Sequence, residues 1–217
     1  LSVPIIKDII RAYRIPILEV SGYEADDVIG TLATEAGRQG IITYMMTPDK
    51  DYGQLVSDNV FMYRPKHSGG FEVMGIDEIK AKFNIRSTEQ VIDMLGLMGD
   101  SSDNIPGCPG VGEKTAQKLV AEFDSIENLL AHTDQLKGAL KTKVEANREM
   151  ITFSKFLATI KVDVPIKLDM TTLVREEPDE EKLRKIFEEL EFRTLIDRVL
   201  KKSGAPLSSS SNSVSPD

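Results

Sequence analysis

Seven acidic side chains fall into three short groups whose residue types and spacing suit the binding of divalent metal ions. The groups lie in Gly22-Tyr23-Glu24-Ala25-Asp26-Asp27, in Thr47-Pro48-Asp49-Lys50-Asp51, and in Gly99-Asp100-Ser101-Ser102-Asp103-Asn104. Crowded carboxylates repel one another, so some would have to stay protonated at neutral pH. A bound divalent cation removes that conflict, and carboxylate oxygens are the ligands that magnesium and manganese prefer. The candidate catalytic and metal-binding residues are therefore Glu24, Asp26, Asp27, Asp49, Asp51, Asp100 and Asp103.

The positions of these acids along the chain indicate that they meet in space. The first group follows an apolar run at 15–20 that reads as a strand, and the second follows a similar run at 41–46. Carboxyl ends of parallel strands are where α/β folds place their sites. A spacing of three puts Asp100 and Asp103 on one face of a helical turn. The pattern predicts two divalent ions held about 4 Å apart for phosphoryl chemistry.

Each acidic group taken alone also has an ordinary structural explanation. Acids at 24–27 would complement the dipole of a helix that begins there. Pro48-Asp49 is a common turn pair, and Asp49 could simply cap a short helix. Asp100 and Asp103 would fit a polar loop with capping residues. The presence of three such groups in one chain favours the metal-binding interpretation.

A glycine-containing segment just after the third acidic group suits the binding of a DNA backbone. It reads Ile105-Pro106-Gly107-Cys108-Pro109-Gly110-Val111-Gly112-Glu113-Lys114-Thr115-Ala116. Glycines let the backbone approach a ligand closely, and the following helix start offers unpaired N–H groups to a phosphate. This arrangement is typical of a helix–hairpin–helix, which contacts DNA without reading its bases. The candidate DNA-binding residues are Gly110, Val111, Gly112, Lys114, Thr115 and Lys118. The alternative is a tight helix–helix connection with Val111 as a core residue.

The remaining hydrophobic pattern predicts an α/β part followed by a helical part, with a boundary near residue 75. A strand, a helix and a strand within residues 15–46 form a βαβ unit, and the apolar run 41–46 indicates a strand buried on both faces of a parallel sheet. Short strands are expected at 59–64 and 71–74, joined by a turn, and a further strand at 159–164. Helices are expected at 3–13, 24–38, 76–83, 88–98, 113–122, 125–131, 138–158 and 181–201.

Composition limits the classes of protein that this chain can be. It has 217 residues, one cysteine and two histidines, which leaves no disulfide framework and no Cys/His zinc pattern and suits a reducing, intracellular setting. No run is apolar enough to span a membrane, and no signal peptide is visible. The formal net charge of −8 argues against a nucleic-acid binder unless the acids carry metal ions that face phosphates.

The three acidic motifs and the hairpin, in this order and spacing, resemble the 5′-nuclease domain of bacterial DNA polymerase I, in the flap endonuclease and PIN-like superfamily. The resemblance extends through Leu200. It implies a PIN-like α/β nuclease domain, N-terminally truncated, at 1–75, and a helix–three-turn–helix (helix–hairpin–helix) DNA-binding subdomain at 76–165. C-terminal helices at 166–202 would pack back on the nuclease domain, and 203–217 would be a flexible linker or tail.

The same resemblance implies the chemistry and the partners. Family members hydrolyse phosphodiesters at 5′ flaps and 5′ ends of duplex DNA with two Mg²⁺ or Mn²⁺ ions, and the hairpin also binds K⁺ or Na⁺. Glu24, Asp26 and Asp27 would hold the first metal or its waters, and the other four acids would complete the second side. A polymerase domain would follow this chain, and the location would be cytoplasmic, at the nucleoid, with no membrane partner.

The chain differs from the family at its start. An aspartate-bearing strand, a second aspartate and a basic helical arch are expected before Leu1, so we expect this fragment to bind metal and duplex DNA weakly and to cleave poorly. Two other functions compete with the nuclease: a non-catalytic duplex-DNA-binding module, and a PIN-type ribonuclease. The helix–hairpin–helix disfavours the ribonuclease because that device suits B-form backbone geometry.

Overall fold

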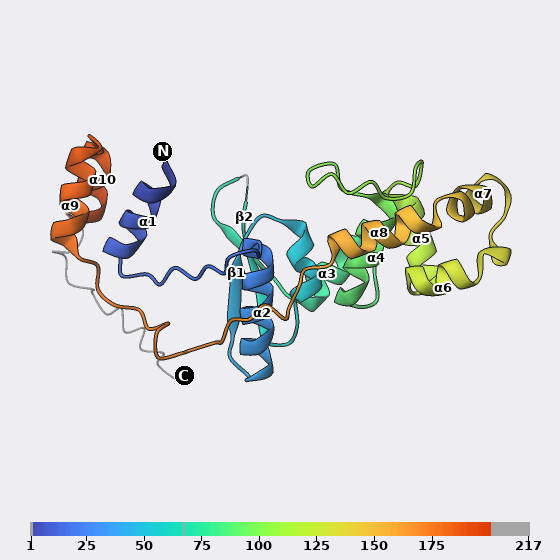
Figure 1. The fold of residues 1–217 in the computed structure, drawn as a ribbon, viewed down its shortest axis with the longest axis horizontal. Coiled ribbons are helices and arrows are strands. Elements are labelled where there is room, and N and C mark those ends of the chain that lie inside the picture. The colour runs from blue at the N-terminus through green and yellow to red at the C-terminus, as the bar shows by residue number, and fades with distance from the viewer. Residues whose placement is uncertain (1, 67, 201–217) are drawn as a thin grey trace, which may run out of the picture. The chain divides into compact units, whose positions relative to one another are not determined.

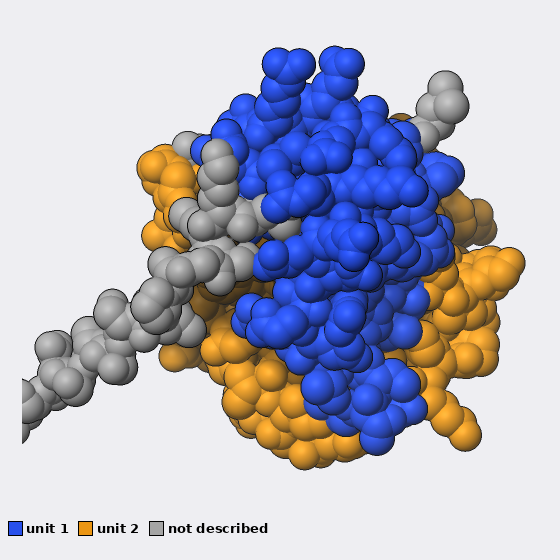
Figure 2. Space-filling model, turned by 90° about the vertical axis from the view of Figure 1, so that its left-hand side faces the viewer, with its two compact units in different colours: residues 1–18, 169–217 blue, residues 19–168 orange. Residues whose placement is uncertain are grey.

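The computed structural model describes residues 2–66 and 68–200, and it divides into two compact units (Figures 1 and 2). One unit combines residues 1–18 with 169–217, and the other comprises residues 19–168. No helix in the described ranges is both long and apolar enough to cross a bilayer. The three boundaries between the four segments expected from the sequence stay predictions, and the predicted tail at 203–217 lies outside the described residues.

In residues 2–18 and 169–200, the described part of the smaller unit, three helices share an apolar core. Helices α1 (Ser2–Ala12), α9 (Glu180–Glu189) and α10 (Arg193–Leu200) confirm the helices expected at 3–13 and 181–201. The Asp179 side chain caps α9 by accepting from the Lys182 amide, and the Asp179 amide donates to the Ala12 carbonyl at 2.8 Å. Leu183 and Phe187 are buried against Ala12. The end of α1 and the start of α9 are therefore fastened together by both hydrogen bonding and apolar packing.

The larger unit contains a three-stranded sheet in the order β1-β2-β3. Strands β1 (Thr43–Met46) and β2 (Val60–Pro65) are parallel, and β2 forms an antiparallel pair with β3 (Phe71–Met74). The short helix η1 (Lys50–Leu55) lies in the connection between β1 and β2, and helix α2 (Ala25–Arg38) precedes β1. Gly37 of α2 lies so close to Val60 that an added Cβ would come within 2.7 Å of its Cγ2 atom. This contact brings α2 tightly against the inner face of the sheet.

The predicted strand at 15–20 is wrong, and with it the predicted βαβ unit. Ile15 donates its amide to the Ile10 carbonyl, which closes the end of α1, and Pro16 has no amide hydrogen to give. The Val20 carbonyl accepts from Tyr23 in a turn. The backbone groups at both ends of this apolar segment therefore form local hydrogen bonds, and residues 15–20 connect α1 to α2 without strand structure.

Burial of β1 on both faces is also wrong. Met45 is 3% exposed, whereas its neighbours Tyr44 and Met46 are 57% and 71% exposed. Side chains alternate across a strand, so only one face of β1 contacts the core. The outer face instead carries stacked rings, with centroids 5.6 Å apart for Tyr44 and Phe61 and 4.6 Å apart for Tyr63 and Phe71.

The helical part matches the expectation closely. It contains α3 (Ile76–Phe83), η2 (Thr88–Gln90), α4 (Val91–Met98), α5 (Glu113–Phe123), α6 (Ile126–Ala131), η3 (Thr133–Gln135), α7 (Gly138–Ala146) and α8 (Arg148–Ala158). Helices α4 and α8 lie side by side (Figure 1). Gly96 permits this contact, because an added Cβ would lie 3.0 Å from the Lys155 Cα.

Two details of the helical part differ from the sequence-based expectation. The helix expected at 138–158 is two helices, because Asn147 leaves helical geometry (φ −120°, ψ 22°) and its amide group donates to the Lys143 carbonyl. The strand expected at 159–164 does not form. Its backbone is bound instead by side chains: Ile160 donates to Gln54, and Val164 donates to Thr31.

A buried ion pair joins three helices of this part. Lys155 of α8 donates to Asp93 of α4 at 2.6 Å and to Glu127 of α6 at 2.7 Å, and Asp93 also accepts from the Ile126 amide at 2.8 Å. The Asp93 side chain is buried, whereas the Glu127 side chain is mostly exposed. The Asp93 carboxylate therefore compensates a half-buried cation, whereas the Glu127 carboxylate remains largely solvated.

We expect Asp93→Ala to lower the free energy of unfolding by about 3 kcal/mol, because it leaves a half-buried ammonium and a buried amide without this partner. Glu127→Ala is the matched control, since it removes the exposed partner of the same lysine and should cost less than about 1 kcal/mol. Urea unfolding monitored by circular dichroism measures both. Equal losses in the two variants would contradict this account.

Candidate metal centre and nucleic-acid interface

Three aspartates from two distant segments meet in the larger unit. Asp51 belongs to η1, whereas Asp100 and Asp103 come from the loop after α4, and each offers a carboxylate oxygen within 4.8 Å of the others. The loop is held by an antiparallel bridge, in which the backbone groups of Asp100 and Ile105 exchange hydrogen bonds of 2.8 and 2.7 Å. This bridge fixes the position of Asp100, and the turn between brings Asp103 to the same place.

Asp51 is the most perturbed member of this cluster. Its side chain is buried, and its Oδ1 atom has no hydrogen-bond partner. Burial, followed by the charge of Asp49, raises the pKa of Asp51 to about 7. A buried carboxylate oxygen without a donor, facing two other carboxylates, has the chemistry expected of a ligand to a hard divalent cation. The residues present therefore fit such an ion.

The other two aspartates differ in their environment. Asp100 is buried, and burial alone would raise its pKa. Hydrogen bonds from Lys50 and from the Ser102 amide outweigh that effect, so the pKa of Asp100 lies below its usual value. Asp103 is exposed, and its pKa is raised by desolvation and then by the charge of Asp100. Hydrogen-bond donors thus lower the pKa of Asp100, whereas desolvation and then the charges of neighbouring carboxylates raise the pKa of Asp103.

The first acidic group faces the same cavity. A cavity of about 290 Å³ is lined by Asp51 and Asp103 on one side and by the three acids at the start of α2 on the other. Glu24 is the N-cap residue of α2 and is exposed. Asp26 accepts a 2.8 Å hydrogen bond from the Tyr52 hydroxyl. Asp27 accepts from the Lys161 amide at 3.0 Å.

Asp49 is placed beside this cavity in a different role. Its side chain accepts from the Asp51 amide at 3.0 Å and caps η1, as the alternative interpretation of Pro48-Asp49 expected. Its charge nevertheless acts on Asp51, and it contributes to the raised pKa of Asp103. Asp49 therefore shapes the field of the cluster while it fixes the start of the helix that carries Asp51.

Sequence reasoning missed several residues that complete the site. Lys50 lies between two of the predicted acids and contacts Asp100. Gln54 donates to the carbonyls of Asp51 and Ala158 at 3.0 and 2.9 Å, and it accepts from the Ile160 amide, which fastens residues 158–160 along the cavity. Of these two residues, only Lys50 could have been identified from the sequence, because it is a cation between two acids of one motif. The contacts of Gln54 depend on a segment more than 100 residues away.

The glycine-containing segment forms a tight connection with Val111 in the core, as the alternative interpretation expected, and its role in DNA binding stays a prediction. The Cys108 carbonyl accepts from the Val111 amide at 2.9 Å, and Gly110 occupies the third position of this turn at φ +75°. Gly112 then precedes α5 with open space around its α-carbon. The amides of Thr115 and Ala116 donate to the Gly112 carbonyl, so at the start of α5 the amides of Glu113 and Lys114 are the ones that could meet an external anion.

The six predicted DNA-binding residues divide into two kinds. Lys114 and Lys118 are exposed on α5, and Thr115 is half-buried beside them. A spacing of four places the two lysines on one face. The Val111 side chain is buried in the core, so only the backbone of the Gly110-Val111-Gly112 turn could contact a ligand. The two exposed lysines lie on the helix that follows the turn. This is the arrangement expected of a phosphate-binding hairpin.

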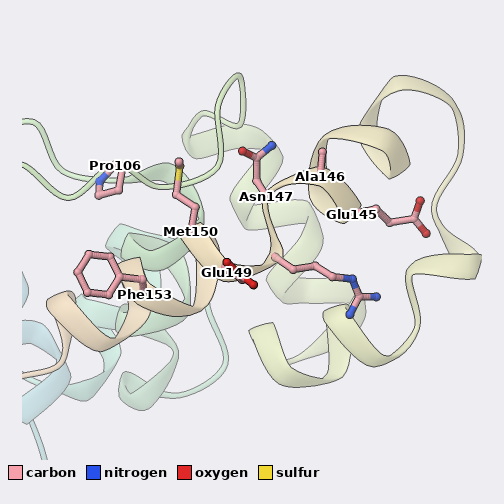
Figure 3. Close-up of a pocket in the computed structure, with 8 residues that line it drawn as sticks. Pro106, Glu145, Ala146, Asn147, Glu149, Met150 and Phe153 are labelled. Carbon is pink, nitrogen blue, oxygen red and sulfur yellow. The ribbon is translucent and has the colours of Figure 1, made fainter.

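A second, wider hollow of about 780 Å³ lies between Pro106 and the junction of α7 and α8 (Figure 3). Its lining combines the apolar side chains of Met150 and Phe153 with the carboxylates of Glu145 and Glu149. The Arg148 guanidinium also lines the hollow, so two carboxylates face one cation and the net negative charge disfavours a phosphate. The acidic cavity and the hairpin therefore remain the candidate functional surfaces.

Comparison with known proteins identifies the family. The family model described as the 5′-3′ exonuclease N-terminal resolvase-like domain matches residues 1–84, and the 5′-3′ exonuclease C-terminal SAM fold matches residues 86–181. DNA polymerase I of Bacillus subtilis is 43% identical over 200 residues, which are 91% of this chain and 23% of that protein. The thermostable DNA polymerase I of Thermus aquaticus is 39% identical over 192 residues, 88% of this chain and 22% of that protein. The chain thus spans about a fifth of the length of these relatives.

Solved structures share the fold. T5 5′-exonuclease superposes with a TM-score of 0.60 at 20% identity, covering 82% of this chain and 62% of that one. The catalytic core of Rad2 superposes with a TM-score of 0.63 at 15% identity, covering 92% of this chain and 66% of that one. The predicted PIN-like α/β architecture with a helical subdomain is confirmed by these neighbours. Two consecutive domain models, together with relatives that align over nine-tenths of its length, place this chain in the 5′-3′ exonuclease family.

Proposed function

We propose that this chain is the metal-dependent nuclease part of a DNA polymerase I, which hydrolyses DNA phosphodiesters at 5′ ends and 5′ flaps in replication and repair. The observation that carries the proposal is the unpartnered, buried Oδ1 atom of Asp51, directed at a cluster with Asp100 and Asp103. A polymerase domain C-terminal to this chain and a location in the cytoplasm at the nucleoid belong to the same proposal. This chain covers about a fifth of the length of its relatives, so the substrate, activity and partners of the whole protein are also proposals.

Each acid has a role in the proposed reaction. Asp51, Asp100 and Asp103 hold one divalent ion, and Glu24, Asp26 and Asp27 hold the other or its waters across the same cavity. Asp49 maintains the start of η1 and adds to the negative field. When bound, Mg²⁺ or Mn²⁺ would lower the pKa of the attacking water and stabilise the charge that develops on the phosphate. The structural neighbours support such ions, because T5 5′-exonuclease is solved with bound zinc and T5 D15 flap endonuclease with DNA and metal ions.

In this proposal, the hairpin surface binds the backbone of duplex DNA. The backbone amides of Gly110, Gly112 and the start of α5 would contact phosphate oxygens, and Lys114, Thr115 and Lys118 would add charge and a hydroxyl. A K⁺ or Na⁺ ion at the turn is part of the proposal. The catalytic core of Rad2 is solved with a DNA substrate, which supports a nucleic-acid partner for this fold.

The test is cleavage of a 5′-flap DNA by the full-length protein that carries this chain. We expect Asp103→Asn and Asp49→Asn each to lower the cleavage rate by about 100-fold or more, while duplex affinity changes less than about threefold, because the hairpin is untouched. Asp58→Asn, which replaces an exposed acid outside the cluster, is the control and should cleave normally.

Cleavage that survives in Asp103→Asn would contradict the metal-nuclease assignment. Normal DNA binding with no cleavage by the unmodified protein would instead indicate a non-catalytic DNA-binding module. A flap made of RNA, compared in the same assay, separates the proposed enzyme from a ribonuclease, since we expect the DNA flap to be the better substrate.

A further inference from the structure

Lys50 is the one charged residue of the motif Thr47-Pro48-Asp49-Lys50-Asp51 to which the proposed nuclease role assigns no function. Its ammonium contacts Asp100 Oδ2 and lies 3.9 Å from Asp51 Oδ1. Asp51 Oδ1 is the same buried atom that lacks a hydrogen-bond donor. The cation of Lys50 is thus already seated at the edge of the three-aspartate cluster.

An ammonium and a divalent ion cannot occupy this position together. Lysine offers three donors and no lone pair, so it cannot join a metal coordination shell. Two cations within about 4 Å also repel each other, and burial of the neighbouring Asp51 and Asp100 side chains strengthens that repulsion. Binding of a metal ion between Asp51 and Asp100 therefore requires the ammonium to move away.

The position of Lys50 allows such a movement. It is the first residue of η1, and about a third of its side chain is exposed, whereas the side chains of its partners Asp100 and Asp51 are 5% and 10% exposed. A flexible four-carbon stem at the solvent edge can swing outward without disturbing the backbone that carries Asp51. The aspartates stay in place while the cation between them is exchanged.

We propose that Lys50 is an internal counter-ion of the metal-free site: its ammonium neutralises the aspartate cluster until a divalent ion displaces it. The residue then has two opposed effects. It stabilises the fold without metal by relieving carboxylate repulsion, and it weakens metal binding by competing for the same oxygens. The inference rests on the proposed metal site.

The experiment is a Mn²⁺ titration of the 217-residue chain by isothermal calorimetry, paired with melting temperatures in EDTA. Lys50→Met removes the charge and keeps the apolar stem. We expect it to bind Mn²⁺ about tenfold more tightly, because a cation at contact distance is lost, with the full Coulomb effect reduced by solvent at a partly exposed side chain. In EDTA we expect it to melt several degrees lower, and saturating Mn²⁺ should abolish that difference.

Two further variants define the outcome. Lys50→Arg keeps the charge and should bind Mn²⁺ no more tightly than the unmodified chain. Lys82→Met makes the same change in net charge nearby, at a lysine that lies over the Phe83 ring, and should leave the Mn²⁺ affinity within about twofold.

Equal or weaker Mn²⁺ binding by Lys50→Met, in a chain that otherwise binds Mn²⁺, would overturn the counter-ion inference and leave the metal site standing. Tighter binding by Lys82→Met to the same degree would overturn it as well, because general charge would then explain the effect. If the unmodified chain bound no Mn²⁺, the proposed metal site would fail first, and the inference with it.

Discussion

Asn in place of Asp51 is expected to make the metal-free protein more stable at pH 8 and to abolish its binding of Mn²⁺. The pKa of Asp51 is raised from 3.8 to about 7 in the folded chain, mainly by burial. Between these two values the folded state holds a proton that the unfolded state has released, so the free energy of unfolding falls as the pH rises. Above about pH 7 the full cost of the buried charge is present.

The asparagine variant carries no such cost. One pKa unit corresponds to 1.36 kcal/mol, so this shift corresponds to about 4 kcal/mol before solvent screening is taken into account. We therefore expect a gain of about 3 kcal/mol at pH 8 and little gain near pH 4. The Oδ1 atom of Asp51 has no hydrogen-bond donor to lose, and the pKa of Asp51 already reflects the attraction of the Lys50 ammonium 3.9 Å away. Urea unfolding in EDTA at pH 4, 6 and 8 measures the effect, and Asp58→Asn at an exposed position should show no change beyond about 0.5 kcal/mol.

Loss of Mn²⁺ binding is the second half of this expected result. Removal of one anionic ligand from a cluster of three should weaken binding by about 100-fold or more. Stability and metal affinity would then change in opposite directions for one substitution. An Asp51→Asn variant that is less stable in EDTA at pH 8 would show that Asp51 serves the fold and not the site.

Ala in place of Gly107 is the second substitution with a large expected effect. Gly107 has φ +63°, and an added Cβ would lie 2.3 Å from the Gly99 amide nitrogen and 2.7 Å from its Cα atom. Both obstacles are backbone, so neither can move aside as a flexible side chain would. The Gly107 amide also donates to the buried Ser154 hydroxyl at 3.0 Å, which joins this loop to α8. We expect a loss of about 3 kcal/mol or more in the free energy of unfolding.

The consequence for function follows from where Gly107 lies. It connects the loop that carries Asp100 and Asp103 to the hairpin turn at Gly110, so strain there should disturb both surfaces at once. Gly112→Ala is the matched control in the same segment, because Gly112 has φ −97° and no atom within 4 Å of the added Cβ. Thermal unfolding of the two variants compares them directly. A Gly107→Ala protein as stable as Gly112→Ala would contradict the close backbone contact.

The meeting of the acids could be predicted from sequence because each group follows a recognisable element or turn. Asp51 follows the apolar run of β1, and Asp100 follows the apolar helix α4. The spacing of three between Asp100 and Asp103 also predicted that their two side chains would lie close together. The capping role of Asp49 was one of two open interpretations, since a carboxylate after proline serves a helix start as readily as a metal.

Other features depend on contacts that local pattern does not contain. An apolar hexapeptide at 15–20 fits a strand or an unpaired connection equally well, because strand formation needs a partner elsewhere in the chain. The run at 41–46 looks buried on both faces, yet Tyr44 and Met46 are exposed. The break at Asn147 arises from one side-chain hydrogen bond to Lys143, and the seating of Lys50 against Asp100 spans 50 residues.

The central claim is that these carboxylates gather to hold divalent ions beside a phosphodiester. Crystals of the chain soaked in Mn²⁺ and measured for anomalous scattering test it most directly. We expect one peak in contact with Asp51, Asp100 and Asp103, and density for a second ion or its waters toward Glu24, Asp26 and Asp27. An empty aspartate cluster at saturating Mn²⁺, with ions bound only at other surfaces, would contradict the account.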